Sequence, residues 1–161
     1  MSGRLRRLGK VATAVAATAG LGSLASKDVN TPWYAALDKP PYQPPGVAFP
    51  IAWTTLYTDI VLTAAHTLDQ LERAGRTEEA ASYRRALAAN LAINAAWSWV
   101  FFRWHRLRPA VGVAGLLALS SADLVRRTGR VSPTAAAALA PYPAWCTFAT
   151  VLSADIARRN R

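Results

Sequence analysis

Residues 46–68 read GVAFPIAWTTLYTDIVLTAAHTL, a stretch of 23 residues that contains one carboxylate, Asp59, and neither lysine nor arginine. A transmembrane helix needs about 20 consecutive and mainly apolar residues. Similar stretches lie on both sides, and we expect membrane spans at 8–26, 46–68, 84–102, 109–126 and 133–157. Because lipid offers the backbone no hydrogen-bond partners, each span must be a helix. The sequence predicts an all-α fold, an integral membrane bundle of five transmembrane helices in a single domain, 1–161.

The charged residues gather in short groups between these apolar stretches. Of the 161 residues, 52% are apolar and 17% are charged, whereas soluble domains average about 25% charged residues. Nineteen Lys and Arg against nine Asp and Glu give a net charge of +10. Basic groups that flank apolar segments are typical of membrane anchors, whereas a nucleic-acid-binding protein more often spreads them over one face. We expect a lipid bilayer as a partner and no nucleic acid.

The first apolar stretch has two interpretations. Residues 11–26 follow a basic N-terminus, which is typical both of a signal peptide and of a first spanning helix. With five spans, the N-terminus shares one side of the membrane with residues 69–85 and 126–130, and this side holds eleven basic residues against eight on the other. The positive-inside rule then predicts a cytoplasmic N-terminus.

Residues 27–45 read KDVNTPWYAALDKPPYQPP and cannot be helical throughout, because proline interrupts the helical hydrogen-bond ladder. Trp33, Tyr34 and Tyr42 among the prolines indicate an ordered loop, and long ordered loops are often functional. We interpret this segment as a lid. Lys39 is the cation placed to meet an anionic ligand, and the alternative is that it anchors the loop at the lipid headgroups.

Conventional catalytic motifs are missing from the sequence. The two histidines, His66 and His105, lack a metal-binding spacing, Cys146 has no CxxC partner, and there is no glycine-rich phosphate loop. We therefore expect no resident metal and no cofactor. A single cysteine also excludes a disulfide-rich module.

Large aromatic residues lie well inside the expected spans. Trp53, Trp97 and Trp145 are each some way from a span end, whereas an interfacial aromatic belt fits Trp104 better. Indoles inside a bundle favour a pocket for a flat apolar ligand. Asn94 precedes Trp97 by three residues on the same helical face. An Asn in a lipid span needs a partner, which is either another helix or a ligand.

Two further features of the spans have alternative interpretations. The residues Ala110, Ala114, Ala118 and Ala122 repeat every four positions, which permits close helix approach and a homodimer seam, or simply reflects abundant alanine. Asp155 places a carboxylate inside a span, which is costly and often functional. The alternative is that Asp155 pairs with Arg158 or Arg159 near the basic C-terminus.

Read together, these segments resemble the TspO/translocator protein family, the tryptophan-rich sensory proteins also called peripheral-type benzodiazepine receptors. The similarity covers all five expected spans. It rests on the motifs Trp33-Tyr34, Leu37-x-Lys39-Pro40, Pro44-Pro45, Trp53-x-x-Leu56-Tyr57, Asn94-x-x-Trp97, Phe101-Phe102 and Pro141-Tyr142-x-x-Trp145-x-x-Phe148. The resemblance implies that the first helix is retained rather than cleaved as a signal peptide.

The resemblance also implies five transmembrane helices, commonly in a homodimer, around a pocket that the loop 27–45 closes. The family's ligands are protoporphyrin IX and related heme-type tetrapyrroles, sterols such as cholesterol in animal members, and synthetic benzodiazepine-type compounds. Matched motif by motif, with Lys39 added from the loop, the expected ligand-binding residues are Trp33, Tyr34, Lys39, Pro44, Trp53, Tyr57, Asn94, Trp97, Phe101, Trp145, Phe148 and Ala149. Trp53 and Trp145 resemble the two indoles that flank the family's pocket.

We therefore expect a tetrapyrrole-binding receptor that senses, sequesters or transports porphyrins, in a stress response. The alternative is a light- and oxygen-dependent porphyrin-degrading enzyme with Trp53 and Trp145 as catalytic residues, because some family members are reported to degrade porphyrin in light. Cholesterol is not the expected ligand, since the last helix, ATVLSADIARRNR, lacks the tyrosine of the weak cholesterol consensus. The preference for Arg over Lys and the abundant Ala favour a bacterial cell membrane.

Overall fold

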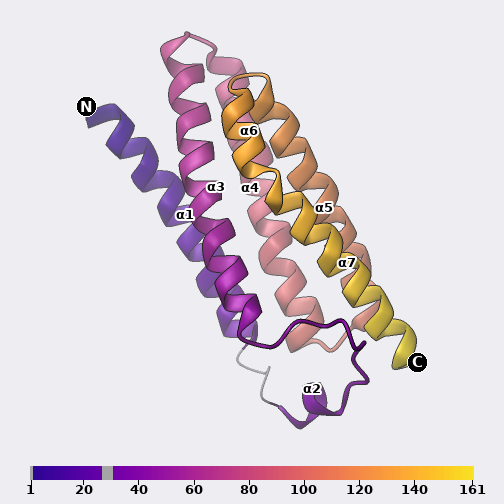
Figure 1. Cartoon of the computed structure of the whole chain (residues 1–161). Helices are drawn as coiled ribbons and strands as arrows, with labels where there is room; N and C mark the ends of the chain where they lie inside the picture. Colours follow the sequence, from indigo (N-terminus) through magenta and orange to yellow (C-terminus); the bar gives the residue numbers. More distant parts are fainter. Residues whose placement is uncertain (1, 27–30) are drawn as a thin grey trace.

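The computed structural model describes residues 2–26 and 31–161, and its regular elements are helices (Figure 1). The long helices are α1 (Ser2–Ser26), α3 (Ala48–Arg73), α4 (Thr77–Ser98), α5 (Leu107–Gly129) and α7 (Pro141–Arg159). The short elements are α2 (Pro32–Ala36), the π-helical turn η2 (Trp99–Arg103) and α6 (Pro133–Leu139). The long helices lie side by side, and α2 lies at the end of the bundle that holds the C-terminus (Figure 1). The predicted all-α fold is confirmed.

The helices differ from the expected spans in two places. The stretch 133–157, expected as one helix, is divided at Ala140 into α6 and α7. Pro141 and Pro143 have no N–H to continue the ladder, and proline is well tolerated in the first turn of a new helix. The stretch 84–102 ends in a π-helical turn, in which the Trp104 N–H donates to the Trp99 carbonyl at 2.9 Å. Such wide turns are common at functional sites.

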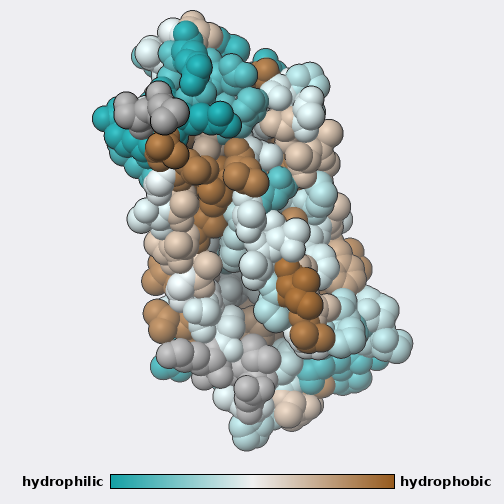
Figure 2. Space-filling model, turned by 60° about the vertical axis from the view of Figure 1, so that its left-hand side comes forward, coloured by the Kyte–Doolittle hydropathy of each residue, from teal (hydrophilic) through white to brown (hydrophobic). Residues whose placement is uncertain are grey.

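The outside of the bundle is rich in exposed apolar side chains. Among the described residues, three stretches are long and apolar enough to cross a membrane, namely α1 from Gly3, α5, and α6 with α7. Large apolar side chains are exposed on the long helices, including Leu21, Ile51, Leu62, Leu116, Leu119 and Val151. Figure 2 shows hydrophilic side chains gathered at one end of the molecule, with apolar patches below them. This distribution is typical of a protein whose sides face lipid.

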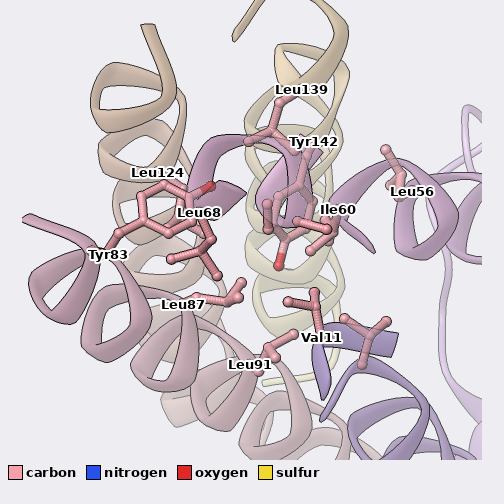
Figure 3. Close-up of a cluster of buried hydrophobic side chains, with 14 of the residues drawn as sticks. Val11, Leu56, Ile60, Leu68, Tyr83, Leu87, Leu91, Leu124, Leu139 and Tyr142 are labelled. Carbon is pink, nitrogen blue, oxygen red and sulfur yellow. The ribbon is translucent and has the colours of Figure 1, made fainter. Parts of the chain in front are cut away.

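A cluster of buried side chains fills the centre of the bundle (Figure 3). Its members come from different helices and include Val11, Leu56, Ile60, Leu68, Tyr83, Leu87, Leu91, Leu124, Leu139 and Tyr142. The hydroxyl of Tyr83 forms a hydrogen bond with the Thr128 hydroxyl at 3.0 Å, which satisfies both groups inside the core. This core fixes the relative positions of the helices that carry the expected site residues.

The alanine ladder of α5 contributes to packing within one protomer. Ala110 and Ala114 are buried, and α5 packs along α7. The other half of the ladder, Ala118 and Ala122, lines an open groove between the same two helices. Close helix approach is therefore confirmed for the first half, while the homodimer seam stays a prediction.

Ion pairs connect α1 to α3, and α3 to α4, at the end of the bundle opposite the C-terminus. The Arg7 guanidinium donates to Glu72 at 2.5 Å and lies 3.1 Å from Asp69. Arg84 donates to Glu72 at 2.7 Å. The hydrogen bond from Arg7, followed by that from Arg84, holds the pKa of the Glu72 carboxyl below its usual range. Glu72 thus joins α4 to α1, whose Arg7 lies 65 positions earlier in the sequence.

Candidate ligand-binding site

Five aromatic side chains of α3 and α7 lie together, and we call them the α3–α7 aromatic group: Phe49, Trp53, Tyr57, Trp145 and Phe148. Phe49, Trp53 and Tyr57 are four residues apart, so they share one face of α3. The ring centroids of Trp53 and Tyr57 are 5.4 Å apart, and those of Trp145 and Phe148 are also 5.4 Å apart. Phe49 meets Trp145 edge-on at 6.0 Å, which joins the two helices. These distances are typical of attractive aromatic pairs.

A second set, which we call the lid aromatic group, joins α2 to the end of α4. Its members are Trp33, Tyr34, Trp97, Phe101 and Phe102. Trp97 stacks on Phe101 at 5.4 Å, Trp33 meets Phe101 edge-on at 6.0 Å, and Tyr34 lies 5.8 Å from Phe102. The π-helical turn carries Phe101 and Phe102 on adjacent positions. Both contact the lid, since Phe101 meets Trp33 and Phe102 lies against Tyr34.

The two aromatic groups meet at one small buried cluster. Phe101, Ala110, Leu152 and Ile156 form this cluster, and side chains of both groups pack against it, among them Trp33, Tyr34, Phe49, Trp97 and Phe148. Trp53, Tyr57 and Trp145 pack instead against the central core, and Trp145 connects to this cluster through its ring contacts with Phe49 and Phe148. Of the other expected residues, Pro44 is half-buried in the loop and Ala149 is half-buried on α7.

His105 is a neighbour of the lid that sequence reasoning did not include in the site. Its ring stacks on Trp33 with centroids 3.9 Å apart and planes 19° from parallel. Its backbone has φ of +54°, a conformation that non-glycine residues adopt infrequently and at some energetic cost. The turn between η2 and α5 thus places the His105 imidazole against Trp33 of the lid. The sequence offered no signal for this position beyond a histidine in an arginine-rich turn.

The lid is tied to the end of α7. The Asp38 N–H donates to the Asn160 side-chain oxygen at 2.9 Å, and the Asn160 amide donates back to the Asp38 carbonyl at 2.9 Å. The Tyr42 hydroxyl donates to Asp155 at 3.2 Å. Asp155 also pairs with Arg158 and Arg159, so its predicted pairing with nearby arginines is confirmed. The contact between Asp155 and the lid was missed.

The ammonium group of Lys39 forms its contacts within the lid. Its ammonium donates to the Leu37 carbonyl at 3.1 Å and to the Ala35 carbonyl at 3.4 Å, and it lies 4.6 Å from the centre of the Tyr34 ring. Lysine often caps the last carbonyls of a helix in this way. In this conformation Lys39 stabilises the C-terminal end of α2. A contact with an anionic ligand requires its ammonium to leave these carbonyls.

Asn94 has partners on two other helices. The Tyr57 hydroxyl donates to the Asn94 side-chain oxygen at 2.8 Å, and the Asn94 amide donates to the Tyr142 hydroxyl at 3.2 Å. Of the two partners expected for Asn94, another helix is therefore present. Asn90, one turn earlier on α4, accepts a hydrogen bond from Tyr142 at 2.8 Å. Sequence reasoning missed Asn90, although its spacing of four from Asn94 places both on one face.

Two buried polar atoms of the region lack a hydrogen-bond partner among the described residues. They are the indole nitrogen of Trp97 and the side-chain oxygen of Gln43. Leaving such a group unpaired costs about 1–3 kcal/mol. The two atoms therefore favour a ligand that offers an acceptor to the Trp97 N–H or a donor to the Gln43 oxygen. The Gln43 amide also donates to the Tyr34 hydroxyl at 3.4 Å, which fixes the loop against α2.

The open groove between α5 and α7 is a separate feature. Its lining includes Gly115, Ala118, Leu119, Pro143, Thr147 and Val151. None of the ligand-binding residues expected from the sequence lines this groove. In the closed conformation described here, the rings of the expected site pack against one another, so a ligand must displace some of these contacts.

An apolar helical bundle with aromatic side chains packed beside a proline-rich segment defines the class as helical membrane proteins. The chain belongs to the TspO/MBR family, whose family model matches residues 11–159. It is 35% identical over 147 residues to the tryptophan-rich sensory protein of Cereibacter sphaeroides, covering 91% of this chain and 87% of that protein. It is 34% identical to the translocator protein of Homo sapiens, covering 80% and 75% of the two chains. Protein CrtK of Rhodobacter capsulatus is 33% identical, with coverage of 80% and 78%.

Proposed function

We propose that this protein binds heme-type tetrapyrroles such as protoporphyrin IX in the membrane and thereby senses, sequesters or transports them. The observation that carries this proposal is the pair of aromatic groups beside the lid, which share one small buried cluster. A flat apolar macrocycle gains stacking and burial from such side chains. The indole N–H of Trp97, which has no acceptor among the described residues, offers a polar contact for an oxygen of the ligand.

The proposed topology has five transmembrane helices: α1, α3, α4 with η2, α5, and α6 with α7. Helix α4 carries polar side chains in its middle, Asn90 and Asn94, but these bond to other helices rather than face lipid. In a bilayer, polar groups are tolerated where they bond across helices. We place the protein in a bacterial cell membrane as a multi-pass protein and a homodimer, with no metal or cofactor of its own.

Ligand binding requires the lid to open and close again. The bonds that hold the lid to α7 are exposed and few, so their net contribution is small compared with the burial of a macrocycle. The relatives are named a sensory protein and a translocator protein, which supports a role in sensing or moving a ligand.

Substitution of Trp145 tests the proposed binding site. Protoporphyrin IX should quench the tryptophan fluorescence of the purified protein saturably, and Trp145→Ala should weaken its binding by about tenfold or more, because a large buried ring contact is lost. Trp104→Ala is the matched control, since Trp104 is 60% exposed. Equal affinity of wild type and Trp145→Ala would remove the proposed site. Absence of saturable quenching in the wild type would refute tetrapyrrole binding.

A further inference from the structure

A chain of buried hydrogen bonds runs across the bundle and ends at the candidate site. It links Ser121 of α5, Asn90 and Asn94 of α4, Tyr142 of α7 and Tyr57 of α3. Asn90, Ser121 and Tyr142 are fully buried. A buried network of this kind is rigid when every member is satisfied, because an unpaired member would be costly.

A backbone carbonyl at the Ser121 end of this chain determines which group donates in each of its hydrogen bonds. Ser121 lies 2.7 Å from the Leu117 carbonyl, which can only accept, so the single hydroxyl hydrogen of Ser121 is used there. The group of Asn90 that faces Ser121 at 3.1 Å must therefore be its amide donor. The Asn90 oxygen then faces Tyr142, which must donate its hydrogen to it.

The same logic continues to the candidate site. Because Tyr142 donates to Asn90, its oxygen can only accept from Asn94, so the amide nitrogen of Asn94 faces Tyr142. The Asn94 oxygen then faces Tyr57, and the hydrogen of the Tyr57 hydroxyl is committed to it at 2.8 Å. Tyr57 has no second hydrogen to give. Its hydroxyl can therefore only accept a further hydrogen bond.

We infer that Tyr142 and Asn90 are positioning residues that hold the Tyr57 hydroxyl as an acceptor, so that the site favours ligands that carry an N–H or O–H donor. The inference rests on the proposed function, because Tyr57 packs against Trp53 in the α3–α7 aromatic group. The two N–H groups of a metal-free tetrapyrrole point inward in the plane of the ring, where the Tyr57 oxygen cannot reach them with good geometry. The donor that Tyr57 can reach lies at the edge of the macrocycle, so the site favours a tetrapyrrole that carries a hydroxyl group there.

The test compares two probes that share their macrocycle, hematoporphyrin, which carries two hydroxyl groups at its edge, and its dimethyl ether, in which both hydroxyl groups are methylated. Wild type should bind the hydroxyl form more tightly by roughly three- to tenfold, which corresponds to one net hydrogen bond. In Tyr142→Phe the Asn94 amide is free to turn, and Tyr57 is no longer restricted to accepting. The ratio of the two affinities should then fall toward one.

Tyr83→Phe is the matched control, because Tyr83 is a buried tyrosine of the same core that bonds to Thr128 and not to this chain. It should keep the wild-type ratio. Ser121→Ala is a smaller change that removes the hydroxyl group bonded to the Leu117 carbonyl. It should lower the ratio of the two affinities as Tyr142→Phe does. A general loss of stability would weaken both probes equally and leave the ratio unchanged.

The outcomes separate the inference from the proposed function. A wild-type ratio of one, or an unchanged ratio in both Tyr142→Phe and Ser121→Ala, overturns the inference while leaving porphyrin binding in place. If neither porphyrin binds saturably to the wild type, the proposed function fails instead.

Discussion

Asn160 uses both ends of its carboxamide on the backbone of one lid residue, Asp38. The same amide nitrogen also donates to the Ile156 carbonyl at 2.9 Å, which holds the side chain against the end of α7. Asn160 therefore anchors the lid. This role needs both a donor and an acceptor on one short side chain, so neither aspartate nor alanine can replace it.

Asn160→Ala should loosen the lid without disturbing the core. We expect faster hydrogen exchange of residues 32–42 and dissociation of bound porphyrin that is about two- to tenfold faster, since one or two exposed hydrogen bonds are lost. Recovery of tryptophan fluorescence after mixing with excess unlabelled acceptor vesicles measures the release rate. Gln70→Ala, which changes an exposed amide on α3, should leave both measurements unchanged. An unchanged release rate in Asn160→Ala would show that the anchor does not limit release.

At the scale of elements, the apolar stretches predict the long helices because length and composition are local properties. The face of α3 that carries Trp53 and Tyr57 also follows from a spacing of four residues. The division of the last span at Ala140 was not predicted. Pro141 and Pro143 are present in the sequence, but a continuous apolar stretch does not indicate by its composition that one helix ends and another begins within it. The anchoring of Asp38 by Asn160 joins residues 122 positions apart, and no local pattern reports such a contact.

The contact between α1, α3 and α4 should depend on pH through Glu72. Its folded-state pKa is lowered by Arg7, so its contribution to stability is fully present above the unfolded pKa of about 4.3 and is lost as pH falls through the folded value. Glu72→Gln should therefore lower the unfolding temperature at pH 7, and the difference from wild type should shrink below about pH 4.

Glu78→Gln is the control for this comparison, because Glu78 is an exposed carboxylate in the same turn region. Its unfolding temperature should follow that of the wild type across the pH range. Unfolding in detergent micelles, followed by circular dichroism, gives the measurement. A difference between Glu72→Gln and wild type that persists undiminished at low pH would assign the effect to packing rather than to charge.

At the scale of the whole molecule, the proposed five spans would place the N-terminus and the C-terminus on opposite sides of the membrane. The turn between α3 and α4 lies at one end, and the lid lies at the other, beside the C-terminus (Figure 1). Figure 2 shows the hydrophilic side chains at one end and apolar patches on the surface below them. The positive-inside rule predicts that the N-terminal end faces the cytoplasm.

Cysteine labelling tests this topology. Cys146 is buried, so the chain has a low background of reactive thiol. A membrane-impermeant maleimide added to intact cells should label Ala36→Cys in the lid and leave Glu78→Cys unlabelled until the cells are opened. Both positions are exposed. Labelling of both from outside would contradict five spans, and the reverse pattern would invert the orientation.

The contact between the lid and α7 also sets the order of biogenesis. The lid residues are synthesised more than 110 positions before their partners Asp155 and Asn160, and chains grow at about 5–20 residues per second. During translation the lid therefore has no anchor for several seconds, while the later helices enter the bilayer. A nascent chain held at the ribosome before α7 emerges would lack Trp145 and Phe148 as well as Asp155 and Asn160, so the candidate site and the anchor of its lid are completed together by the last helix.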